Sequence, residues 1–160
     1  MSPHHSEVEV DGIIKMFRTE IQAGSFNVAA LFADETGCDW AYSIGLEHNF
    51  NHPELLVVGL EATFAGAVIE LLGEEIAAGR HLGAGEVVRL AGGINLQVRD
   101  VDPLWLARGD WFVLGRIVME AWGQRWPETL QLVWSDEQGE SPVIPGDPVW
   151  SLRQPLLMHN

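Results

Sequence analysis

The side chains best suited to chemistry gather in residues 40–60. Within this stretch His48, His52 and Glu54 lie in a polar segment with two asparagines and a proline, a composition that predicts a loop. A loop that leaves the edge of a sheet is a common place for function. We expect His52 to be the acid/base or ligand-orienting group and Glu54 its partner. Ser43, just before the loop, is the third catalytic candidate.

A metal site is the alternative use of the same residues. His48, His52 and Glu54 offer two imidazoles and a carboxylate, which suit zinc or non-haem iron. The spacing of the histidines would place both on one face of a helix, but a loop gives no such face. The sequence has no H-E-x-x-H or C-x-x-C motif. The interpretation without a metal is therefore favoured, with His48 and His52 as the candidates if one binds.

Nucleophilic and phosphate chemistry find less support. Ser43 does not lie in a G-x-S-x-G elbow. Cys38 is followed by Asp39, whose carboxylate disfavours the reactive thiolate. The glycine-rich stretch 83–93 lacks the strand–turn–helix context of a phosphate-binding loop, and no G-K-[ST] follows it.

Five side chains on the predicted strands or directly after the last of them are the ligand-binding candidates. Large aromatics more often fill cores than line pockets, and a buried amide must find hydrogen-bond partners. We expect these residues to border a pocket if the strand before the loop and the last strand meet near it. They are Trp40, Tyr42, Gln131, Trp134 and Asp136.

Composition limits the classes of function. A chain of 160 residues suits a single domain, 1–160, with a sizeable core. Its net charge of −14, with only nine Lys and Arg, opposes binding to nucleic acid or to an anionic membrane. Cys38 is the only cysteine, which rules out a disulfide within the chain. With a polar N-terminus and no apolar span, the sequence predicts a cytoplasmic protein.

Periodicity predicts the elements that must position these residues. Apolar residues at helical spacing predict a helix over about 7–23 and another over 63–78, with Thr63 as N-cap and Gly79 as the stop. A third helical region, interrupted by glycines, follows Pro103. Alternating or continuous apolar runs predict strands at 25–33, 39–46, 55–60, 87–88, 94–98 and 130–134.

The first strand of the central stretch has two unlike faces. A strand over Trp40–Leu46 places the bulky residues, Leu46 included, on one face, and Ala41, Ser43 and Gly45 on the other. A flat face admits a closely packed helix or a flat ligand. We favour the helix.

The order of elements predicts an α+β domain. We expect a mainly antiparallel sheet of about five to six strands, with about two to four packed helices, because short links join consecutive strands. A small barrel closed from the same strands is the alternative. Residues 135–160, which are rich in proline, are expected to form an irregular wrap over the core.

A set of short segments resembles a known family. Tyr42–Leu46, His52–Leu55 and Gly59-Leu60 form one group; Leu130–Trp134, Asp136, Gly139, Pro142 and Gln154–Leu156 form another. Together they resemble the domain of unknown function 4262 family of bacterial proteins, over roughly residues 10–157. Ser135 and Val143 depart from the family pattern, which weighs against ligand contacts from the tail. The family name carries no activity, so the resemblance implies a site around the His52-Pro53-Glu54 loop and not a reaction.

Three functions follow as hypotheses. The first is a domain that binds a small molecule, with or without catalysis, in a pocket around the His52-Pro53-Glu54 loop. The second is an acidic interaction or regulatory module that binds a protein partner and has no catalysis. The third, a flavin-binding small barrel, ranks lower because few basic residues are present to hold a phosphate.

Overall fold

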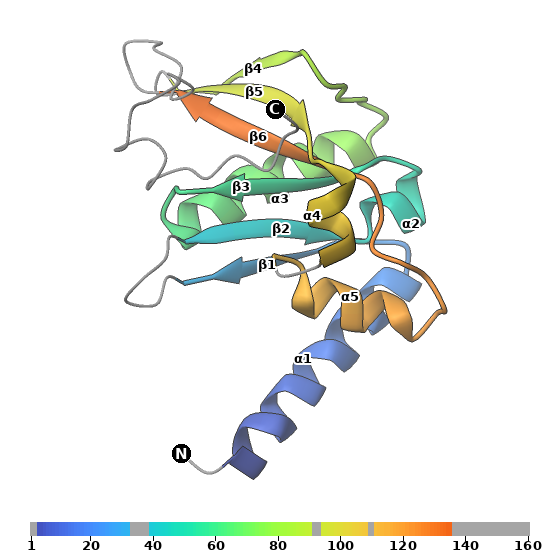
Figure 1. The fold of residues 1–160 in the computed structure, drawn as a ribbon. Coiled ribbons are helices and arrows are strands. Elements are labelled where there is room, and N and C mark those ends of the chain that lie inside the picture. The colour runs from blue at the N-terminus through green and yellow to red at the C-terminus, as the bar shows by residue number, and fades with distance from the viewer. Residues whose placement is uncertain (1–2, 33–38, 91–93, 109–110, 136–160) are drawn as a thin grey trace.

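The computed structural model describes residues 3–32, 39–90, 94–108 and 111–135. The wrap was expected over residues 135–160; Ser135 instead ends a strand, and the rest of that range lies outside the described residues. In the part described, six strands form one sheet and five helices pack around it (Figure 1). The elements are α1 (Pro3–Gln22), β1 (Asn27–Leu31), β2 (Trp40–Ile44), α2 (Leu46–Phe50), β3 (Glu54–Val58), α3 (Ala62–Ala77), β4 (Val87–Arg89), β5 (Asn95–Asp100), α4 (Pro103–Arg108), α5 (Val113–Glu120) and β6 (Thr129–Ser135).

The sheet is open and mostly antiparallel, in the order β1-β2-β3-β6-β5-β4. Only β3 and β6 run parallel, and they pair from Glu54 with Thr129 to Leu56 with Gln131. The predicted α+β class is confirmed, and the sheet does not close into the barrel that was the alternative. No described helix is long and apolar enough to cross a membrane.

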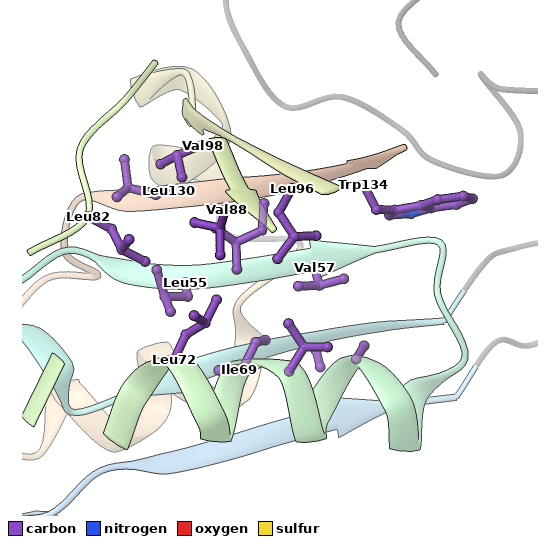
Figure 2. Close-up of a cluster of buried hydrophobic side chains, with 14 of the residues drawn as sticks. Leu55, Val57, Ile69, Leu72, Leu82, Val88, Leu96, Val98, Leu130 and Trp134 are labelled. Atoms are coloured by element: carbon purple, nitrogen blue, oxygen red, sulfur yellow. The ribbon is translucent and has the colours of Figure 1, made fainter. Parts of the chain in front are cut away.

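Helices cover the two faces of the sheet differently. On one face α3 packs against β1, β2 and β3, and Figure 2 shows Ile69 and Leu72 of α3 pointing toward Leu55 and Val57 of β3. The same cluster of buried residues continues over β4, β5 and β6 to Trp134. On the opposite face α1, α4 and α5 pack over Tyr42, Ile44, Leu56 and Val58.

The two faces of β2 are used as predicted, with one exception. Ala41 packs into the cluster beneath α3, whereas Tyr42 and Ile44 join the cluster beneath α1 and α5. The small side chain of Ala41 therefore admits α3, which is the interpretation that we favoured. Leu46 was predicted on the face of Tyr42, but it begins α2 and packs in the α3 cluster instead.

Two helix predictions need correction. Thr63 is not the N-cap of α3, because the Glu61 carboxylate accepts hydrogen bonds from the N–H groups of Thr63 and Phe64, at 3.0 and 3.1 Å. The segment expected as a loop contains the five-residue helix α2. Gly79, with φ of 110°, ends the α3 segment as predicted, and the region after Pro103 forms two helices, α4 and α5.

Candidate functional site

The carboxylate of Glu54 holds the start of α2. Glu54 is the first residue of β3, and its side chain is 0% exposed. Its Oε2 accepts from the N–H of Gly45 at 2.8 Å, and its Oε1 accepts from the N–H of Leu46 at 3.0 Å. The first N–H groups of a helix have no partner within the helix, so a buried acceptor stabilises even this short one. Gly45 itself has φ of 112°, a conformation that favours glycine.

Ser43 completes this network between β2 and β3. Its hydroxyl donates to Oε1 of Glu54 at 2.8 Å and accepts from the N–H of Leu55, also at 2.8 Å. The β2–β3 ladder reaches only to the pair Tyr42 and Leu56, so the serine hydroxyl continues the link where backbone pairing ends. The structure thus brings together two of the three catalytic candidates, Ser43 and Glu54.

Burial changes the acidity of Glu54. Desolvation raises its pKa from 4.5 to about 7, although the hydrogen bonds from Ser43 and from the α2 backbone oppose the rise. A carboxyl with such a pKa can gain or lose a proton near neutral pH. The carboxyl is fully buried and both of its oxygens accept hydrogen bonds. We therefore expect the gain or loss of this proton to change the stability of the fold.

His52 is also buried and fully hydrogen-bonded. Its Nδ1 lies 2.8 Å from the carbonyl oxygen of Pro53, and its Nε2 accepts from the N–H of Leu82 at 2.9 Å. These partners require the neutral ring with its proton on Nδ1. Burial is the largest cause that lowers the pKa of His52, and the neighbouring ring of His81 lowers it further. His52 therefore joins the loop before β3 to the segment before β4, and its catalytic role stays a prediction.

The two candidate metal ligands face different neighbours. His48 is exposed on α2, where its ring stacks on Trp122 with centroids 5.1 Å apart. His52 is buried against His81 and Leu82. Among the described residues, no group of three or more His, Cys, Asp or Glu side chains could hold a metal ion.

The predicted ligand-binding residues are dispersed and mostly buried. Trp40 donates through Nε1 to the carbonyl oxygen of Trp111 at 3.1 Å, and Trp134 donates to that of Val58 at 3.0 Å. Gln131 is fully buried in β6. Asp136 lies outside the described residues. These contacts fasten elements to one another, and the role of these residues in ligand binding stays a prediction.

A cleft of about 450 Å³ lies between α4, α5 and the segment that follows α5. It combines apolar surface with two guanidinium groups, a carboxylate and an amide. Its charged and polar lining residues are Arg116, Glu120, Gln124 and Arg125, and its apolar lining residues are Leu106, Ala107 and Trp126.

The Trp126 wall of the cleft is held rigidly. The indole Nε1 donates to the hydroxyl of Thr129 at 2.9 Å. The ring stacks on Phe112 with centroids 5.0 Å apart and meets Tyr42 edge-on at 5.4 Å. Tyr42 accepts from the N–H of Gly115 at 3.0 Å, and burial raises its pKa to about 12. Tyr42 thus packs against Trp126 but does not line the cleft.

The network around Glu54 lies next to this wall. Glu54 pairs with Thr129 in the parallel ladder, and Thr129 holds Trp126. On the other side, α2 carries His48, whose Nδ1 lies 3.4 Å from Oε1 of Gln124 at the rim of the cleft. The residues singled out from the sequence therefore contact residues of the cleft lining without lining it themselves: Glu54 acts through Thr129 on Trp126, and His48 lies beside Gln124.

Sequence reasoning missed the two arginines of the cleft. Arg116 and Arg125 belong to a segment that was assigned only as a helical region and its end. The available signal was the scarcity of cations, because the whole chain has only nine Lys and Arg. Two of these nine basic residues line one cleft, which is unusual in a chain with a net charge of −14.

The comparisons with known proteins give one result. The family model described as Domain of unknown function (DUF4262) matches residues 20–147. Neither the curated proteins nor the solved structures gave a match. The model covers more than half of the chain, so the chain belongs to this family.

Proposed function

We propose that this member of the DUF4262 family is a small-molecule-binding domain whose ligand occupies the cleft between α4 and α5. The cleft itself carries the proposal. Its volume of about 450 Å³ lies within the range of about 300–1,000 Å³ that is usual for ligand pockets. It also joins apolar walls to a few charged groups, which is the usual composition of such sites.

In this proposal the buried network around Glu54 is structural and does not contact the ligand. A ligand at Ser43, His52 or Glu54 would have to replace hydrogen bonds that these groups already make with the backbone. Leaving a buried donor without a partner costs about 1–3 kcal/mol. A ligand at the α4–α5 cleft meets a wall that is already fixed by Tyr42 and Thr129, so it breaks none of these bonds.

Fragment binding followed by NMR tests the proposal. Titration of the full chain with a library of small fragments should shift the amide signals of residues 106–107 and 116–126 together. Ala107→Trp should abolish these shifts, because the indole fills the cleft that Ala107 lines. Ala77→Trp, at an exposed position on α3 on the opposite face, is the matched control and should leave them intact. Shifts that persist in Ala107→Trp, or no fragment shifts in the cleft, would refute the proposal.

A second candidate is an interaction with an extended basic segment of a partner protein at the edge of β1. Among the described residues β1 pairs with β2 alone, so its other edge can receive a further strand. A hollow of about 400 Å³ beside this edge is lined by Glu20, Glu70 and Glu74. Isothermal titration with an extended lysine-rich peptide should give binding that Glu70→Lys weakens and that salt reduces. Peptide binding that is indifferent to both changes would count against this candidate.

The proposal also includes the cellular compartment of the protein and the kinds of partner that it does not bind. The single Cys38 and the net charge of −14 support a cytoplasmic protein that binds neither nucleic acid nor membrane. Cell fractionation, together with gel-shift titration of the purified chain against duplex DNA, tests both expectations. Recovery in a membrane fraction, or a retarded DNA band at physiological salt, would contradict them.

A further inference from the structure

Resting on the proposed function, we infer that the ligand of the α4–α5 cleft is a zwitterion with an apolar body, the chemistry of an apolar amino acid or a short apolar peptide. The lining offers one negative and one positive side chain that are not engaged elsewhere, together with apolar surface. The inference extends the proposed function from a binding site to a chemical class of ligand.

Two of the charged side chains described in the lining are available to a ligand. Arg116 already takes part in another interaction, so it is not counted as a contact for the ligand. Glu120 and Arg125 are exposed, and within the described part of the chain neither forms a hydrogen bond or an ion pair. The lining therefore presents one carboxylate and one guanidinium group whose hydrogen-bonding capacity is unused.

These two charges complement a zwitterion. Glu120 and Arg125 line the same cleft but do not pair with each other. A ligand that carries both charges can bind between them, because its carboxylate matches the planar donors of Arg125 and its ammonium group can donate to Glu120. A ligand with a single charge engages only one of the two side chains.

The acidity of the whole chain neither favours nor opposes such a ligand. The long-range field of a chain with a net charge of −14 acts on the net charge of a ligand, and a zwitterion has none. Contacts inside the cleft therefore decide the affinity.

The apolar part of the lining requires a ligand with a body. Leu106, Ala107 and Trp126 contribute carbon surface to the cleft. Trp126 is only 8% exposed, and Phe112 and Thr129 hold its ring in place, so it adds a fixed apolar edge. An apolar side chain on the ligand covers this surface, and such burial of apolar area favours binding.

NMR titration of the full chain with L-tryptophan and three analogues tests the inference. L-Tryptophanamide lacks the carboxylate, N-acetyl-L-tryptophan lacks the ammonium group, and glycine lacks the apolar body. L-Tryptophan should shift the amide signals of residues 106–107 and 116–126 at millimolar concentration. Each analogue should bind at least about threefold more weakly, because each loses either one charged hydrogen-bonding group or the apolar contact.

Single substitutions assign the two charges. Arg125→Gln should weaken L-tryptophan and N-acetyl-L-tryptophan about threefold to tenfold and leave L-tryptophanamide unchanged. Glu120→Gln should weaken L-tryptophan and L-tryptophanamide by a similar factor and leave N-acetyl-L-tryptophan unchanged. Arg89→Gln and Glu70→Gln remove the same charges from exposed positions on β4 and α3, outside the cleft lining, and should change none of these affinities. Circular dichroism and urea unfolding check that all four variants fold.

The outcomes separate this inference from the proposed function. An analogue that binds as tightly as L-tryptophan, or equal losses in the cleft variants and their controls, overturns the zwitterion and leaves the cleft. Binding of neither L-tryptophan nor the dipeptide L-tryptophylglycine also overturns it. Tighter binding of the dipeptide identifies a peptide as the source of the zwitterion, and tighter binding of L-tryptophan identifies a free amino acid. The cleft itself fails only if fragment shifts are absent or persist in Ala107→Trp.

Discussion

Glu54→Gln tests whether the buried carboxyl makes the stability of the fold depend on pH. The pKa of Glu54 is raised from 4.5 to about 7 in the folded chain. Between these values the folded state binds the proton more tightly than the unfolded chain does. Stability contributed by this group is therefore greatest at low pH and is lost as pH rises towards 7. Glutamine has no such proton, so the variant lacks this dependence.

The size of the effect follows from the two pKa values. A shift from 4.5 to about 7 corresponds to about 3 kcal/mol in total. Most of it, about 2–3 kcal/mol, falls between about pH 5 and about pH 8. Over this interval the free energy of unfolding of the native chain should fall relative to that of Glu54→Gln by that amount. The glutamine amide also faces the N–H groups of α2, which adds a constant cost of about 1–3 kcal/mol.

Urea unfolding followed by tryptophan fluorescence measures both contributions. The seven tryptophans supply the signal, and about pH 5 stays above the sequence pI of about 4.6. Glu70→Gln is the control, because it removes the same charge from an exposed position on α3. His52 is unchanged in all three proteins, so its own titration cancels. Parallel profiles of the native chain and Glu54→Gln from about pH 5 to about pH 8 would refute the reasoning.

Two further predictions concern groups packed near the site. The pKa of His52 is lowered from 6.5, so the stability from its neutral ring is complete above that pH and is lost as pH falls below it; His52→Gln should therefore gain on the native chain in urea unfolding below pH 6.5, and a constant difference would contradict this. Gly115→Ala should reduce the free energy of unfolding by about 1–3 kcal/mol, because the added Cβ overlaps the Trp126 ring. Gly12→Ala, with no atom near its added Cβ, should raise it by about 0.5–1 kcal/mol, and equal effects of the two would be inconsistent with the packing.

Sequence patterns predicted most elements because their signals are local. The alternation through β2 separates Ala41 from Tyr42 in any strand, and the structure places them in the two predicted faces. Gly79 stops its helical segment through its own backbone freedom. The short helix α2 escaped prediction because the carboxylate that caps it comes from Glu54, beyond its end.

The candidate site, like the fold, could be predicted only in part from the sequence. Residue type indicated that Ser43, His52 and Glu54 would lie close to one another, and Ser43 and Glu54 do form a hydrogen bond. Their remaining partners are backbone groups, such as the N–H of Leu82, which no side-chain pattern reveals. The α4–α5 cleft has no motif because it arises where two helices and the segment after α5 meet.

The sequence by itself determined the periodicity of the elements, the acidic balance and the scarcity of cations. Only the tertiary structure decided where those elements meet. The parallel pairing of β3 with β6 sets Glu54 beside Thr129, and Thr129 in turn fixes Trp126 at the wall of the cleft. Side-chain alternation assigns a residue to a face of a strand, but it does not choose the neighbouring strand. That choice depends on the burial of residues far apart in the chain, so the site exists only once the sheet has formed.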